Sequence, residues 1–143
     1  FNNFYATNGT ANDTQFPDCD FFVLRAAEAY LTYAEATARQ NGGDATADGI
    51  TYLNQIRQRA RASQKAGYSL SDICDEWSRE FYFEGRRRMD LIRFNRYAGD
   101  VNYNWAWKGG TLTGRNIDKH YSLFAIPTTD KTANVNLTQN PGY

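Results

Sequence analysis

Carboxylates recur at helical spacing in two parts of the 143-residue sequence. Glu28 and Glu35 lie seven residues apart, and a later run has intervals of four residues: Glu76, Glu80 and Glu84. Acids on facing helices could bind a metal ion or act as general acid and base. The only histidine is His120, in a distant segment, so the Glu-x-x-His pattern of a di-iron site is missing. We therefore predict no metal site and no catalytic residue.

A structural network of salt bridges explains these acids better. Arginines surround them in the sequence: Arg25, Arg79, Arg86, Arg87, Arg88 and Arg93. Glu84 and Arg88 have the i, i+4 spacing of a helical ion pair, and guanidinium groups can hold carboxylates with two hydrogen bonds. Removing one partner of a buried pair would leave a desolvated charge. We predict a network that includes Glu28, Glu80, Glu84 and Arg88.

A segment with two tryptophans is the candidate binding site. Residues 102–108 read Asn-Tyr-Asn-Trp-Ala-Trp-Lys and show no helical period. Flat indole and phenol faces can stack on the C–H faces of sugar rings, while Asn and Lys108 side chains could donate hydrogen bonds to hydroxyls. We predict that Tyr103, Trp105 and Trp107 bind a neutral oligosaccharide. The alternative is that Trp105 or Trp107 only anchors the loop on the helices.

The charge balance and the missing motifs exclude several classes of protein. Sixteen basic and sixteen acidic residues give no net charge, which removes the long-range attraction for nucleic acid. No phosphate-binding loop, nucleophile elbow or Cys/His pair occurs, so we predict neither an enzyme nor a cofactor. A glycoside hydrolase stays an alternative if two carboxylates flank a cleft at about 5–5.5 or 6.5–9.5 Å.

The two cysteines give no sign of a metal or redox motif. Cys19 and Cys74 lie 55 positions apart without CxxC spacing. Apolar neighbours such as Phe22 and Trp77 favour two buried thiols. A disulfide between them stays open, because the redox compartment decides it rather than the spacing.

Apolar periodicity divides the chain into parts that would position these groups. Residues 1–18 are rich in Asn, Thr and Gly, which is typical of a loop. Residues 19–62 carry apolar residues at three- and four-residue intervals on either side of a glycine pair, which predicts two antiparallel helices. One long helix is predicted over residues 71–98, after a capping arrangement at Ser69 and Ser71. Residues 99–143 lack helical period and predict loops and a tail, with an extended segment from His120 to Ile126.

Four stretches in the same order resemble one known family. They are Arg25–Ala36, Leu53–Ala60, Trp77–Phe94 and the final Ile126–Tyr143. Together they resemble the carboxyl-terminal part of the SusD/RagB-like family, the surface nutrient-binding lipoproteins of Bacteroidetes. The chain begins without Met, signal peptide or lipidation site, so we expect a carboxyl-terminal fragment, residues 1–143, of such a protein.

The resemblance implies an all-α fold: a tetratricopeptide-like helix pair, a long helix and an irregular carboxyl-terminal region. It also implies a non-catalytic glycan-binding subunit of a nutrient-uptake complex at the cell outer membrane. Its partners would be an oligosaccharide and a SusC-like TonB-dependent transporter, and its membrane contact a lipid anchor outside this chain. Two alternatives stay open: a peptide-binding member of the family, and a helical-repeat interaction module without a soluble ligand.

Overall fold

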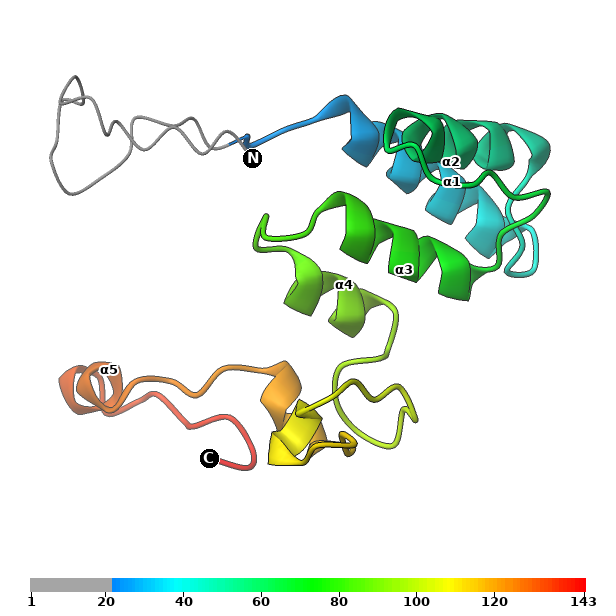
Figure 1. Cartoon of the computed structure of the whole chain (residues 1–143). Coiled ribbons are helices and arrows are strands. Elements are labelled where there is room, and N and C mark those ends of the chain that lie inside the picture. Colours follow the sequence, from blue (N-terminus) through cyan, green and yellow to red (C-terminus); the bar gives the residue numbers. More distant parts are fainter. Residues whose placement is uncertain (1–21) are drawn as a thin grey trace, which may run out of the picture.

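The computed structural model describes residues 22–143 and shows a helical protein (Figure 1). Its helices are α1 (Ala26–Gln40), α2 (Ala47–Arg59), α3 (Leu70–Glu80), α4 (Arg87–Arg93) and α5 (Thr128–Ala133), with 3-10 turns η1 (Lys108–Gly110) and η2 (Lys119–Ser122). Between residues 22 and 143 there is no β-strand, apart from an isolated bridge between Asp44 and Ser69. The predicted all-α class is confirmed. The predicted loop 1–18 lies outside the described residues.

The helix pair α1 and α2 forms one layer of the molecule. Small residues let the two axes come close, since the Cα of Ala34 lies 3.4 Å from where a Cβ on Gly49 would stand. The buried face of the pair consists of Ala27, Leu31, Ala34, Ala38, Leu53 and Ile56. Thr46 caps α2 by accepting the Gly49 N–H. Residues 22–25, predicted to be helical, precede the first turn of α1.

Helix α3 supplies the other half of the core. Ser69 and Asp72 form a capping box, in which each side chain accepts the backbone N–H of the other residue. Ile73, Trp77 and Phe81 then pack into the same hydrophobic cluster as α1 and α2. The core therefore lies between the helix pair and α3, as the apolar period predicted (Figure 1).

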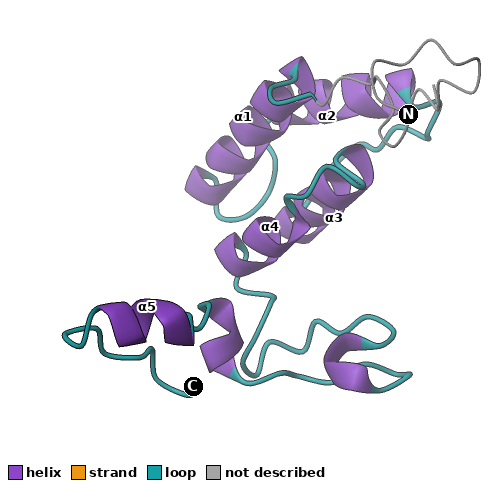
Figure 2. Ribbon diagram, turned by 90° about the vertical axis from the view of Figure 1, so that its left-hand side faces the viewer, coloured by secondary structure: helices purple, strands orange, loops and turns teal. Residues whose placement is uncertain are grey.

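The predicted long helix 71–98 is wrong, because the chain reverses after α3. Phe83 and Gly85 have positive φ angles of 64° and 77°, a left-handed conformation that no α-helix can continue through. Helix α4 starts at Arg87 and runs back beside α3, which Figures 1 and 2 both show. Leu91 is buried as predicted, but from a separate helix.

Beyond α4 the chain forms loops and short helical turns. The extended segment predicted from His120 to Ile126 is wrong at its start, because Asp118 accepts the His120 N–H and caps η2. Helix α5 was also not predicted, and it follows Pro127. After Lys108 no residue is fully buried. This region therefore depends on polar and ring contacts rather than on a core. No described helix is long and apolar enough to cross a bilayer.

Candidate functional site

Residues 102–108, called the tryptophan loop below, carry two partly exposed indole rings. Trp105 is 40% exposed and Trp107 is 65% exposed. The Trp107 N–H donates to Thr111 O at 3.0 Å, and Trp107 has a positive φ of 69°. Gly114 closes the loop from the other side, where a Cβ would come within 2.3 Å of Trp105 O. The loop backbone is thus held in one shape while both indole side chains stay partly exposed.

Tyr103 anchors this loop to the helices. Its hydroxyl donates to Asp75 Oδ1 at 2.7 Å and accepts from Arg87 Nη2 at 2.9 Å. Burial, and then the hydrogen bond to Asp75, raise the pKa of Tyr103. The Arg96 guanidinium lies 4.6 Å from the ring centre. The phenol therefore ties the loop to α3 and α4 and stays protonated at neutral pH.

Lys108 does not face a ligand, so that part of the prediction is wrong. The residue is 3% exposed, and its ammonium group donates to Tyr103 O at 2.8 Å. It also lies 4.9 Å from the centre of the Trp105 ring. Burial lowers the pKa of Lys108. The side chain was expected to reach outward, yet its stem and charge support the loop from within.

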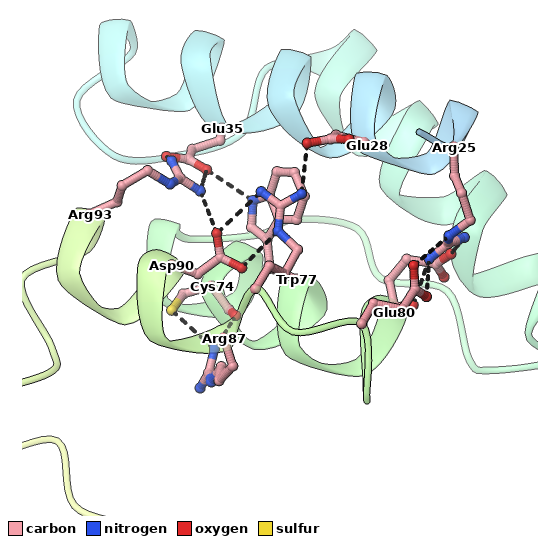
Figure 3. Close-up of polar contacts among 11 residues, drawn as sticks. Arg25, Glu28, Glu35, Cys74, Trp77, Glu80, Arg87, Asp90 and Arg93 are labelled. Carbon is pink, nitrogen blue, oxygen red and sulfur yellow. Dashed lines mark hydrogen bonds and ion pairs between the residues drawn. The ribbon is translucent and has the colours of Figure 1, made fainter. Parts of the chain in front are cut away.

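A buried charge network joins α1 to α4 (Figure 3). Glu35 accepts from Trp77 Nε1 and Arg93 Nη2, both at 2.9 Å, and also from Arg39 and Arg93 Nη1. Burial alone would raise the pKa of Glu35, but these hydrogen bonds outweigh it and lower the pKa. Asp90 is fully buried and accepts from Arg93 and Arg86.

The predicted acids bind two arginines outside the Glu35 cluster or at its edge, Arg25 and Arg86. Glu28 accepts from Arg86 Nη1 at 2.7 Å. Glu80 and Glu84 both accept from Arg25, at 2.6 Å and 2.8–2.9 Å. Sequence reasoning singled out these acids but gave no central role to Glu35 and Asp90. The sequence marked these two acids only by their spacing from arginines. Glu35 has the i,i+4 spacing with Arg39, and Asp90 has helical spacing with Arg86 and Arg93.

The predicted Glu84–Arg88 pair is wrong. The turn between α3 and α4 separates the two residues, so the i, i+4 spacing does not apply. Arg88 Nη2 instead donates to Tyr121 O at 2.8 Å and Ser122 O at 3.2 Å. Its guanidinium lies 4.0 Å from the centre of the Phe124 ring. Arg88 therefore fastens the carboxyl-terminal region to α4.

Cys74 is a buried free thiol. Arg87 Nη1 donates to Cys74 O at 3.0 Å and lies 3.7 Å from Sγ. Burial raises the pKa of Cys74 despite this nearby cation. The thiol therefore stays protonated and packs as an apolar side chain. Cys19 lies outside the described residues.

A cleft of about 540 Å³ opens beside the tryptophan loop. Tyr97 and Tyr121 line it, together with Asn116 and Asp118. Sequence reasoning missed these residues, because they come from loops that are far apart in the chain and have no periodic pattern. Residues 22–143 contain no cluster of three or more His, Cys, Asp or Glu that could hold a metal ion.

Comparisons with known proteins point to one family. The SusD family model matches residues 1–143. The starch-binding protein SusD of Bacteroides thetaiotaomicron is 42% identical over 142 residues, which cover 99% of this chain and 25% of that protein. A SusD-like protein of Bacteroides ovatus is 36% identical over 91 residues, or 62% of this chain and 17% of that protein.

Solved structures agree with the sequence matches. A SusD superfamily protein from Parabacteroides distasonis superposes with a TM-score of 0.68 at 27% identity, over 92% of this chain and 29% of that chain. Surface glycan-binding protein A from Bacteroides uniformis superposes with a TM-score of 0.67 at 28% identity, over 84% of this chain and 27% of that chain. The chain thus spans about a quarter of the length of these relatives.

Proposed function

The chain belongs to the SusD family, and from that membership we propose that it is part of a non-catalytic glycan-binding protein. One observation carries the proposal: 42% identity over 142 residues to a protein named for binding starch. The fold match to a surface glycan-binding protein supports it. The family predicted from four sequence motifs is thereby confirmed, while the ligand of this protein is our proposal.

The cellular setting follows from the same membership. We place the whole protein at the surface of the cell outer membrane, held by a lipid anchor outside this chain. There it captures oligosaccharides and delivers them to a SusC-like TonB-dependent transporter. Delivery needs ligand release, so binding by ring stacking and hydrogen bonds suits it better than a covalent step.

We assign the sugar contact in this chain to the tryptophan loop. The side chains of Trp105 and Trp107 are partly exposed on a backbone that is already held in place, so little freedom is lost when a sugar stacks on them. Tyr103 was predicted as a third contact. Its hydroxyl is engaged by Asp75 and Arg87, which favours a role in positioning the loop.

The carboxylates of the helices have hydrogen-bond partners that favour a structural role over hydrolysis. Asp75 accepts the Tyr103 hydroxyl, and Glu35 and Asp90 are buried among arginines. A glycosidase needs one protonated acid with a raised pKa opposite a second carboxylate. The pKa of Glu35 is lowered instead. Glu35 therefore lacks the property that a general acid requires.

Calorimetry on the full-length protein tests the proposal. Wild type and a Trp105→Ala/Trp107→Ala variant are titrated with a panel of neutral oligosaccharides that includes maltoheptaose. We expect the double variant to bind at least about tenfold more weakly, which equals about 1.4 kcal/mol. Tyr82→Ala is the matched control, because Tyr82 is 65% exposed, like Trp107, but lies outside the loop.

Each result has a clear meaning. Equal binding by the double variant and wild type would contradict the assignment of the loop. Wild type that binds no oligosaccharide, but binds peptides of a parallel panel, would replace glycan by peptide as the ligand. Binding of neither class would favour an interaction module without a soluble ligand.

A further inference from the structure

The cleft beside the tryptophan loop has walls that come from three segments. Tyr97 follows α4, Asn116 and Asp118 follow η1, and Tyr121 lies in η2. Its volume of about 540 Å³ lies within the range of about 300–1,000 Å³ that small-molecule sites occupy. None of these residues belongs to the loop to which the glycan contact is assigned above.

Hydrogen bonds hold the walls of the cleft in place. The Gly99 N–H donates to Ile117 O at 2.8 Å, which joins the segment after α4 to the segment after η1. Arg88 fixes the two tyrosines, because its guanidinium lies 5.0 Å from the Tyr97 ring centre and donates to Tyr121 O. The cleft is thus a built feature of this region and not a gap between loose loops.

Asn116 lines this cleft and has one side-chain atom without a partner. Its Oδ1 is buried and accepts no hydrogen bond within residues 22–143. A buried acceptor without a donor destabilises a protein, so such atoms are uncommon in native structures. Because this oxygen is also closed off from solvent, the Asn116 side chain has to turn toward the cleft before a ligand hydroxyl can supply the missing donor.

The other groups of the cleft fit a neutral polyhydroxylated ligand. Arg115 supplies one cation at the rim, where its Nε donates to Gly109 O at 2.8 Å. Asp118 supplies one anion, and both of its hydrogen bonds from His120 end on Oδ1, which leaves Oδ2 as an acceptor for a hydroxyl. Opposite charges offset each other, so neither a strongly acidic nor a strongly basic ligand is favoured.

We propose that this cleft is a second sugar subsite, in which Asn116 and Asp118 accept sugar hydroxyls between Tyr97 and Tyr121. The inference rests on the proposed glycan-binding function. The cleft and the tryptophan loop share a backbone, since the Arg115 N–H donates to Lys108 O at 3.0 Å and Gly109 lines the cleft. One oligosaccharide chain can therefore stack on the indoles and continue into the cleft.

The test compares probes of two lengths on the full-length protein. Wild type, Asn116→Leu and Trp107→Ala are titrated with maltotriose and maltoheptaose. We expect Asn116→Leu to bind maltoheptaose about tenfold more weakly, with a smaller effect on maltotriose. Its melting temperature should equal or exceed that of wild type, because the substitution removes an unpaired buried oxygen. A variant that had merely lost structure would not combine weaker maltoheptaose binding with an unchanged or higher melting temperature.

One control and a second cleft variant keep the test decisive. Asn136→Ala removes an exposed asparagine that does not line the cleft, and should bind like wild type. Arg115→Met changes the exposed rim and should also weaken maltoheptaose binding, even if Asn116→Leu folds poorly.

The outcomes separate the two proposals. In one outcome wild type binds the probes, Trp107→Ala binds them more weakly, and both cleft variants, Asn116→Leu and Arg115→Met, bind like wild type. That outcome overturns the subsite proposal and leaves the glycan-binding function standing. If wild type binds neither probe nor any other oligosaccharide, the function and the subsite fall together.

Discussion

Glu35 shows at the scale of one residue how this protein accommodates a buried charge. Each carboxylate oxygen accepts two hydrogen bonds. Oε1 accepts from Arg39 and Arg93, and Oε2 accepts from Arg93 and the Trp77 indole. Trp77 is itself in the core, so the network connects the helix pair, α3 and α4. A buried ion pair of this kind is stabilising only while all of its partners are present.

The Glu35→Gln variant should be less stable at neutral pH, by about 1–3 kcal/mol, because an amide nitrogen would face arginine donors. The lowered pKa of Glu35 also gives a pH signature. A depressed carboxyl pKa stabilises the folded state above the unfolded value of about 4.3, and this contribution is lost as pH falls through the folded pKa. Urea unfolding of both proteins from about pH 7 to about pH 3 measures the effect.

The difference in stability between the two proteins should therefore be largest at neutral pH and shrink in acid. Glu28→Gln is the matched control, since Glu28 is on the same helix but its side chain is 34% exposed with one arginine partner. A constant difference at every pH would contradict the assignment to the ionised carboxylate.

At the scale of elements, the break between α3 and α4 decides which residues become neighbours. Gly85 takes a φ of 77° in that turn, which is readily available to glycine but costs other residues about 1–2 kcal/mol. The reversal places Arg86 over the Trp77 ring, with its guanidinium 3.9 Å from the ring centre. A continuous helix would carry Arg86 away from Trp77.

Gly85→Ala should lower the free energy of unfolding by about 1–2 kcal/mol. Nothing lies within 4 Å of the added Cβ, so the effect is one of backbone conformation and not of a clash. Gly67→Ala is the control: its Cβ also meets nothing within 4 Å, and its φ lies outside the positive range. We expect it to be neutral or stabilising by up to about 1 kcal/mol. Equal denaturation midpoints for the two variants would argue against a strained turn.

At the scale of the whole molecule, apolar burial stabilises the core, whereas polar and ring contacts hold the carboxyl-terminal region. The core consists of α1, α2 and α3, whereas residues after Lys108 contribute no fully buried side chain. In Figures 1 and 2 this region extends away from the helix layers. Arg88 bridges the two parts through the carbonyls of Tyr121 and Ser122.

Arg88→Met should loosen that region without unfolding the core. Methionine keeps an apolar stem but donates no hydrogen bond, so amides from Tyr121 to Phe124 should exchange with solvent about tenfold faster or more. Amides of α1 and α3 should keep their protection. Hydrogen exchange followed by mass spectrometry measures both, with exposed Arg61→Met as the control. Uniform acceleration throughout the chain would show that Arg88 supports the core instead.

The sequence by itself determined the local features and the family. Apolar residues at helical period located α1, α2 and α3, because burial of one helix face follows from chain geometry. Ser69 and Asp72 marked the start of α3 within one turn, because a cap is a local hydrogen bond. The motifs from Arg25 to Tyr143 identified the family.

Only the tertiary structure decided the pairings. Spacing assigned Arg88 to Glu84, yet the turn at Phe83 and Gly85 separates the two residues. Glu84 binds Arg25 instead, the N-cap residue of the distant helix α1. Lys108 turned inward because carbonyls and the Trp105 ring stabilise its charge there. The cleft at Asn116 likewise depends on loops that meet only after folding. Such contacts join residues far apart in the chain, so no local pattern records them.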